Sequence, residues 1–239
     1  MCNQTNSVLP SQESTPRTKS RIATYLSAQL APDAFLEVEL MLLAFAAGIN
    51  DATTFPDYRV FASNQTGNTA LLAVGALGLA QETVDLRDVG FSLGLFVVGG
   101  TLLGQLGHRR GRTKRSWLLC TNIVQTLFVF AAAALRHWVS TDIDNSARFA
   151  VICLLAFASG GQVAMARTVD VPEVTTAMVT SAYIDLVTDR ALFAARNRPR
   201  NRRGVFVLAL LLGSFIGAAA YREVSPAFAL LLAGLVKLG

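Results

Sequence analysis

The residues of this chain that are best suited to chemistry form a polar string between two apolar stretches. The string runs from Gly48 to Ala52 (Gly-Ile-Asn-Asp-Ala) and, after a short gap, from Ser63 to Thr69 (Ser-Asn-Gln-Thr-Gly-Asn-Thr). The flanking residues 40–47 and 70–80 are almost wholly apolar. Polar groups in hydrocarbon are costly, about 2.5–3.5 kcal/mol for an Asp at a helix centre, so they usually face a bundle interior or a water cavity. The string is therefore our first hypothesis for a functional site.

Asp51 is the carboxylate of this string, and besides a solvent-facing position at the membrane boundary two interpretations of it stay open. Counted from Val38, it lies about 20 Å along a helix, past the middle of a membrane. It either caps a broken helix end or bonds to a neighbouring helix, or it is a coupling carboxylate that carries an ion or a proton.

The second half of the string begins an apolar run, so it is expected to lie at a helix N-terminus. Asn64 or Thr66 could cap that helix. A helix N-terminus offers free N–H groups and a positive dipole end to an anionic group of a solute. The alternative is polar packing between helices. The candidate binding residues in this half of the chain are Asn50, Asp51, Asn64, Gln65, Thr66 and Asn68.

The composition predicts an all-α, polytopic transmembrane helical bundle. Hydrophobic residues make up 52% of the 239 positions and charged residues only 15%, against about 25% in a soluble domain. Several runs approach the roughly 20 apolar residues that a spanning helix needs. These runs are residues 35–55, 66–80, 89–106, 117–135, 149–166 and 205–221, with weaker ones at 177–195 and 226–238. We expect one membrane domain at 35–239, preceded by a flexible polar tail at 1–34.

A comparison of the chain with itself predicts an internal tandem repeat, with copies at about 35–135 and 149–238. Residues 48–52 resemble 160–164, residues 60–67 resemble 174–181, and residues 100–104 resemble 213–217, all at nearly the same offset. The last pair has Gly-x-x-x-Gly spacing, which lets helices pack closely. If every apolar run crosses the membrane, each copy has four spans and the copies are parallel. A re-entrant segment at 177–195 is the alternative, so six to eight spans are expected.

The second copy supplies further candidate binding residues, and we expect the two copies to meet at a shared site. These candidates are Gln162, Thr176, Thr180 and Asp185. Asp51 aligns with Val163, so the two copies are alike in pattern and unlike in charge.

Basic residues gather in two short runs, 108–115 and 196–203, between apolar segments. Such runs set membrane orientation by facing the cytosol and contact lipid headgroups. We expect the 196–203 run to be cytosolic. If the N-terminus is inside and eight helices cross, the 108–115 run falls on the other side. No module for nucleic-acid binding is present.

Five short motifs of the chain point to a known family. They are Gly48-x-x-Asp-Ala-x-x-Phe, Phe61-x-Ser-x-Gln-Thr-Gly-Asn-Thr, Ser159-Gly-Gly-Gln, Val174-Thr-Thr and Thr180-Ser-x-Tyr-x-Asp-Leu. In these motifs the chain resembles the YoaK-like family of uncharacterised multi-pass membrane proteins (domain of unknown function 1275), in its fungal form. The resemblance implies an all-helical membrane fold and no established activity, substrate or cofactor.

An enzyme is not expected. The two histidines, His108 and His137, lie at loop boundaries, and no hydrolase, metalloprotease or phosphate-binding motif appears. Asp51 and Asp185 are the one pair that an intramembrane aspartyl protease could use, and their surroundings do not resemble those enzymes. We predict no metal and no cofactor.

The leading hypothesis is a small transporter or permease, in the plasma membrane, for a small polar or anionic solute. Its partners would be membrane lipids and that solute. The rival is a non-transporting membrane scaffold or interaction protein whose polar residues only join helices. A cavity lined by Asn50, Asp51, Asn64, Asn68 and Gln162 would favour transport.

Overall fold

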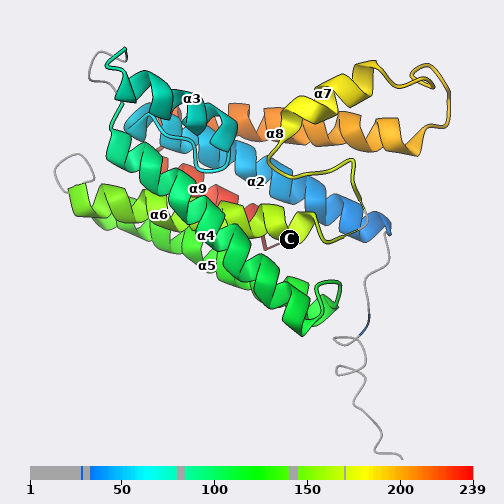
Figure 1. Ribbon diagram of the computed structural model, residues 1–239, viewed down its shortest axis with the longest axis horizontal. Coiled ribbons are helices and arrows are strands. Elements are labelled where there is room, and N and C mark those ends of the chain that lie inside the picture. Colours follow the sequence, from blue (N-terminus) through cyan, green and yellow to red (C-terminus); the bar gives the residue numbers. More distant parts are fainter. Residues whose placement is uncertain (1–27, 29–32, 80–83, 140–144, 170, 239) are drawn as a thin grey trace, which may run out of the picture.

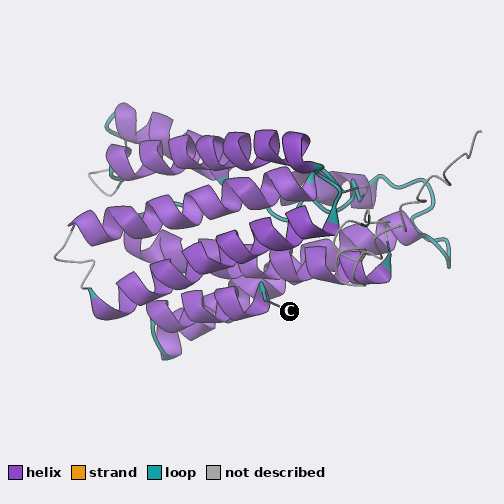
Figure 2. Ribbon diagram, turned by 90° about the horizontal axis from the view of Figure 1, so that it is seen from below, coloured by secondary structure: helices purple, strands orange, loops and turns teal. Residues whose placement is uncertain are grey.

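The computed structural model describes residues 28, 33–79, 84–139, 145–169 and 171–238. Almost all of the predicted tail at 1–34 lies outside these residues. The described part of the chain is all-helical and forms a bundle (Figures 1 and 2), as the apolar runs predicted.

Eight helices make up the described part of the chain. They are α2 (Ala34–Tyr58), α3 (Gln65–Ala76), α4 (Leu86–Arg110), α5 (Arg115–Trp138), α6 (Asn145–Ala166), α7 (Val179–Val187), α8 (Arg198–Glu223) and α9 (Pro226–Val236). Several begin at side-chain caps: Asp33 accepts the Leu36 N–H at 2.8 Å, and Ser225 accepts the Phe228 N–H at 3.1 Å. Gly111 ends α4 with a φ of 92°, a conformation that glycine adopts without strain.

Four helices are long and apolar enough to cross a membrane, judged by length and composition: α4, α5, α6 and α8. The 25-residue α2 lies among them, and the apolar α9 is shorter, with 11 residues. The helices α3 and α7 have 12 and 9 residues. At 1.5 Å per residue they are about 18 and 14 Å long, well short of a hydrocarbon core of about 30 Å. A span at 66–80 is thus ruled out by helix length, and the short α7 fits the re-entrant alternative for 177–195.

The two ends of the bundle are held by different ion pairs. At one end, Glu37 of α2 pairs with Arg198 and with Arg202 of α8, and Arg202 also reaches Glu173 at 3.2 Å. Thr168, just after α6, donates to the Arg112 carbonyl oxygen in the α4–α5 turn at 3.4 Å. Both basic runs therefore lie at this end, which we call the basic end.

At the opposite end, Asp57 of α2 accepts hydrogen bonds from Arg136 of α5, at 3.0 and 3.2 Å, and from the Tyr221 hydroxyl of α8. Arg148, near the start of α6, pairs with Asp88 in the first turn of α4. Its guanidinium also lies 5.6 Å from the centroid of the Tyr58 ring, at the end of α2. These contacts fix the direction of the helices: α2, α5 and α8 run from the basic end, whereas α4 and α6 run towards it.

The first helices of the two predicted copies, α2 and α6, therefore run in opposite directions. Their third helices, α4 and α8, also run in opposite directions to each other. Parallel copies would run the same way, so the parallel arrangement expected from eight spans is wrong. The reason is that α3 is too short to cross, so the first predicted copy contains an odd number of long helices (α2, α4 and α5), and α6 starts from the opposite end.

Close helix packing joins α2 to α8 and α4 to α6. A Cβ atom at Gly160 would lie 2.0 Å from the Phe96 carbonyl oxygen, and one at Gly213 would lie 2.0 Å from the Phe45 carbonyl oxygen. Only glycine permits these backbone contacts. The short helix α7 packs on α8, and α3 packs on α4. The helices α5 and α9 pack against each other, and α5 also contacts α6 while α9 contacts α2.

Candidate functional site

A partly open cavity of about 840 Å³ lies where the two short helices begin. Figure 1 shows α3 and α7 on the same side of the long helices, α3 towards one end and α7 towards the other. The cavity receives the first residues of α3 and of α7, the second half of α2 and the middle of α8. Its polar lining residues are Asp51, Ser63, Asn64, Gln65, Thr66, Thr180, Ser181 and Ser214.

The N-terminus of α3 is tied down by its own polar side chains. Asn64 caps it by accepting the Gly67 N–H at 3.2 Å. The fully buried Asn68 accepts the Phe61 N–H at 2.9 Å and donates to the Phe61 carbonyl oxygen at 2.8 Å. The same amide group also donates to Gln65 at 2.9 Å and to Ser92 of α4 at 3.1 Å. Asn68 therefore holds the chain that enters α3, and it does not line the cavity.

Asp51 of α2 also binds the segment that leads into α3. Its carboxylate accepts the Ser63 N–H at 2.6 Å and the Ser63 hydroxyl at 2.7 Å. Both carboxylate oxygens thus bind the segment before α3, which turns the chain back into the bundle after α2 ends. Asp51 lines the cavity as well. Its hydrogen bonds give it a structural role, and a role in carrying an ion or a proton stays a prediction.

The N-terminus of α7 differs, because no side chain caps it. Its N-cap residue is Met178, whose side chain makes no capping hydrogen bond to the backbone. The exposed Thr180 and Ser181 of the first turn line the cavity. The preceding Thr176 is fully buried, has a left-handed φ of 60°, and its hydroxyl has no partner among the described residues. A β-branched residue is strained in that conformation.

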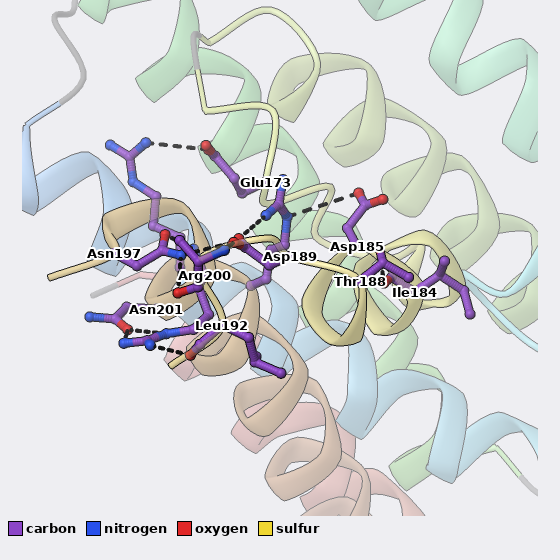
Figure 3. Close-up of polar contacts among 12 residues, drawn as sticks. Glu173, Ile184, Asp185, Thr188, Asp189, Leu192, Asn197, Arg200 and Asn201 are labelled. Carbon is purple, nitrogen blue, oxygen red and sulfur yellow. Dashed lines mark hydrogen bonds and ion pairs between the residues drawn. The ribbon is translucent and has the colours of Figure 1, made fainter. Parts of the chain in front are cut away.

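The segment after α7 is bonded to the start of α8, as Figure 3 shows. Asp185 lies 3.9 Å from Arg203, and Asp189 lies 3.3 Å from the same guanidinium. Asn197 donates to Asp189 at 3.0 Å, and Arg200 donates to the Ala194 carbonyl oxygen at 2.8 Å. Part of the second basic run is therefore bound to the protein itself. Asp185 is more than half exposed and does not line the cavity.

A second polar cluster, which we call the lysine cluster, lies in the interior and consists of Lys237, Gln125 and Gln162. The Lys237 ammonium, just after α9, donates to the Gln125 side-chain oxygen of α5 at 3.4 Å and to the Gln162 side-chain oxygen of α6. The Gln162 amide donates to the Leu43 carbonyl oxygen of α2 at 3.1 Å. All three side chains are at most 3% exposed. Lys237 and Gln125 were not among the sequence candidates, although each is a long polar residue in an apolar run.

The structure brings some predicted site residues together and separates others. Asp51, Asn64, Gln65, Thr66 and Thr180 line one cavity. Asn50, Asn68 and Gln162 do not line it, because all three are buried and lie outside it. Asn68 and Gln162 bond to neighbouring segments, and the Asn50 side-chain oxygen has no partner among the described residues. Thr176 and Asp185 are likewise absent from the lining. Whether the lining residues bind a solute stays a prediction.

The apolar helices and the buried polar clusters define a multi-pass, membrane-embedded helical protein. The profile of the family described as "Protein of unknown function (DUF1275)" matches residues 40–239, so the chain belongs to this family, in agreement with the resemblance of its motifs. No curated protein and no solved structure matches the chain.

Proposed function

We propose that this protein is a small transporter for a small polar or anionic solute, which binds in the cavity between α3 and α7. The observation that carries the proposal is the uncapped first turn of α7, with Thr180 and Ser181, in a cavity of about 840 Å³. A helix N-terminus offers N–H donors and a positive dipole end, and the two hydroxyls add hydrogen bonds to an anionic group.

The position and chemistry of the cavity support this proposal. Its lining reaches Leu210 and Leu211 near the middle of α8, which is at membrane depth if α8 crosses. The helices around the cavity come from both predicted copies, and transporters built from inverted repeats bind their solutes at such interfaces. The apolar remainder of the lining, including Phe55, Phe96 and Phe215, fits a solute with a small hydrocarbon part and one charged or polar group.

A scaffold function is the second candidate, and one observation favours it. Asp51, Asn68 and Gln162 each bond to a neighbouring segment of the chain, which is what a role in joining helices requires. In that case the cavity would bind no solute.

Binding by the purified protein distinguishes the two. We expect one or more small carboxylates, among acetate, lactate and benzoate, to raise the thermal midpoint in detergent, because a ligand that binds only the folded state stabilises it. The double variant Thr180→Val with Ser181→Ala should lose this response. Thr188→Val is the matched control, since Thr188 is the exposed C-cap residue of α7, donates to the Ile184 carbonyl oxygen and lies outside the cavity.

Uptake of the stabilising carboxylate into proteoliposomes then tests transport itself. Binding without uptake would argue against a transporter, and the absence of any response in this panel and in an added panel of neutral polar solutes would favour the scaffold.

We also propose that the basic end faces the cytosol, in the plasma membrane, because both basic runs lie there. An impermeant thiol reagent on intact cells should fail to label Arg196→Cys and should label Arg222→Cys, at the opposite end, in a chain whose own cysteines are replaced. The reverse pattern would overturn this orientation.

A further inference from the structure

The lysine cluster lies where two packed groups of helices meet. One group contains α2, α8 and α7, and the other contains α4, α6, α3 and α5. The short α9 packs on both, against α2 and α8 of the first group and against α5 of the second. Lys237, just after α9, reaches two side-chain oxygens of the second group, on Gln125 and Gln162, and the Gln162 amide in turn donates to the Leu43 carbonyl oxygen of the first group. The solute cavity is also shared by the two groups, through α7 and α8 on one side and α3 and Phe96 on the other.

The Lys237 ammonium has no carboxylate partner in the part of the chain that the structure describes. Both of its acceptors are neutral amides, and the side chain is 3% exposed. A buried ammonium that is not neutralised is costly, and ionisable groups inside membrane bundles are the usual carriers of protons.

Most other charged groups on the helices around Lys237 are paired or lie at helix ends, and Glu39, in the second turn of α2, forms no ion pair among the described residues. On α2, Asp51, Asp57 and Glu37 bond to partners away from the cluster. The titratable or charged residues of the other three helices are Arg115, Cys120, Arg136 and His137 on α5, Arg148 and Cys153 on α6, and Arg198, Arg200, Arg202, Arg203, Tyr221, Arg222 and Glu223 on α8. The one carboxylate among these, Glu223, pairs with Arg222.

Gln125 can form a hydrogen bond with Lys237 whether the lysine is charged or neutral. Its side-chain oxygen faces the ammonium at 3.4 Å, whereas its amide nitrogen is buried and has no partner among the described residues. A neutral amine has a lone pair, so it can accept a hydrogen bond as well as donate. Rotating the Gln125 amide by half a turn would present its N–H groups to that lone pair.

We propose that Lys237, held by Gln125 and Gln162, is a reversible proton-binding site that couples proton movement to the relative motion of the two helix groups. When Lys237 loses its proton, the contact between the two helix groups loses a charge. The Gln125 and Gln162 amides can still form hydrogen bonds with the neutral amine. As a coupling site it rests on the transport function proposed above, but the binding of the proton does not.

The test follows the thermal midpoint of the purified full chain in detergent as a function of pH, with no solute present. We expect the midpoint of the wild-type protein to rise by several degrees in one step as the pH rises, because deprotonation removes the cost of the buried charge. Lys237→Met should lack the step. Lys114→Met, which changes an exposed lysine in the α4–α5 turn, should retain it.

Gln125→Glu provides a second variant in case Lys237→Met does not fold. A carboxylate beside the ammonium would keep the lysine charged, so this variant should fold and lack the step. A step that persists in Lys237→Met, or in Gln125→Glu, would overturn the proposal. If the step depends on Lys237 and no solute is ever transported, the transport function fails while the proton site stands.

Discussion

The N-termini of α3 and α7 begin at the same cavity and are built differently. At α3, side chains satisfy the helix start and the chain before it: Asn64 caps the helix, Asn68 binds Phe61, and Asp51 binds Ser63. At α7, Met178 provides no cap, and the hydroxyls of Thr180 and Ser181 lie in the lining of the cavity. A polar residue next to a cavity is therefore not equivalent to a polar residue available to a solute. The comparison assigns a structural role to the start of α3 and leaves the start of α7 available for the solute binding proposed above.

Replacing Asn68 should give the largest effect on stability. Asn68→Leu removes the partners of the Phe61 N–H and carbonyl groups in a buried place, so we expect a loss of about 3 kcal/mol or more. Asn64→Ala, which removes only an exposed cap, should cost about 1 kcal/mol. Denaturation of the purified protein measures both. Equal losses for the two variants would mean that Asn68 does not organise the start of α3.

Replacing Asp51 should come next. Asp51→Ala removes two hydrogen bonds to a charged acceptor, and we expect a loss of about 2 kcal/mol. Asp51→Asn keeps one acceptor for the Ser63 N–H and should lose about half as much. If Asp51→Asn instead leaves stability unchanged and abolishes proton-coupled uptake, the carboxylate is a coupling group and the contrast between α3 and α7 is weaker than the hydrogen bonds indicate.

The hydroxyls of α7 should affect binding and leave stability nearly unchanged. The double variant Thr180→Val with Ser181→Ala should weaken carboxylate binding about tenfold, equivalent to about 1.4 kcal/mol. Its thermal midpoint without ligand should match that of the wild type, because both residues are exposed. Titration of the ligand against the thermal midpoint measures the change. A lower midpoint with unchanged affinity would place these hydroxyls among the structural residues.

Giving α7 the cap that α3 has should produce the smallest change. Met178→Asn supplies a side-chain acceptor for the N–H groups of the first turn, which should stabilise the protein by about 1 kcal/mol. The same acceptor competes with an anionic solute for those groups, so affinity should fall as stability rises. The opposite signs are the diagnostic result, and unchanged affinity would show that the solute does not use the N-terminus of α7.

Much of this protein could be predicted from short windows of its sequence. Whether residues 86–110 or 198–223 can cross a membrane depends on their own length and hydropathy, and both form long apolar helices. The motifs around Gly48, Phe61 and Ser159 were sufficient to indicate the family that the profile match shows. Asp51 and Thr180 were selected as polar residues in apolar surroundings, and the structure places both at the cavity.

The tertiary structure decided what local pattern does not contain. Hydropathy does not reveal that α3 ends after 12 residues, so it did not predict that α6 runs opposite to α2. It also marked Asn68 and Asp185 as equals of Thr180, although Asn68 binds the backbone of Phe61 and Asp185 lies beside Arg203. Lys237 meets Gln125 across more than one hundred residues of chain. The physical reason is that the cost of burying a polar group belongs to the residue, whereas the partner that offsets this cost is chosen by how the helices pack.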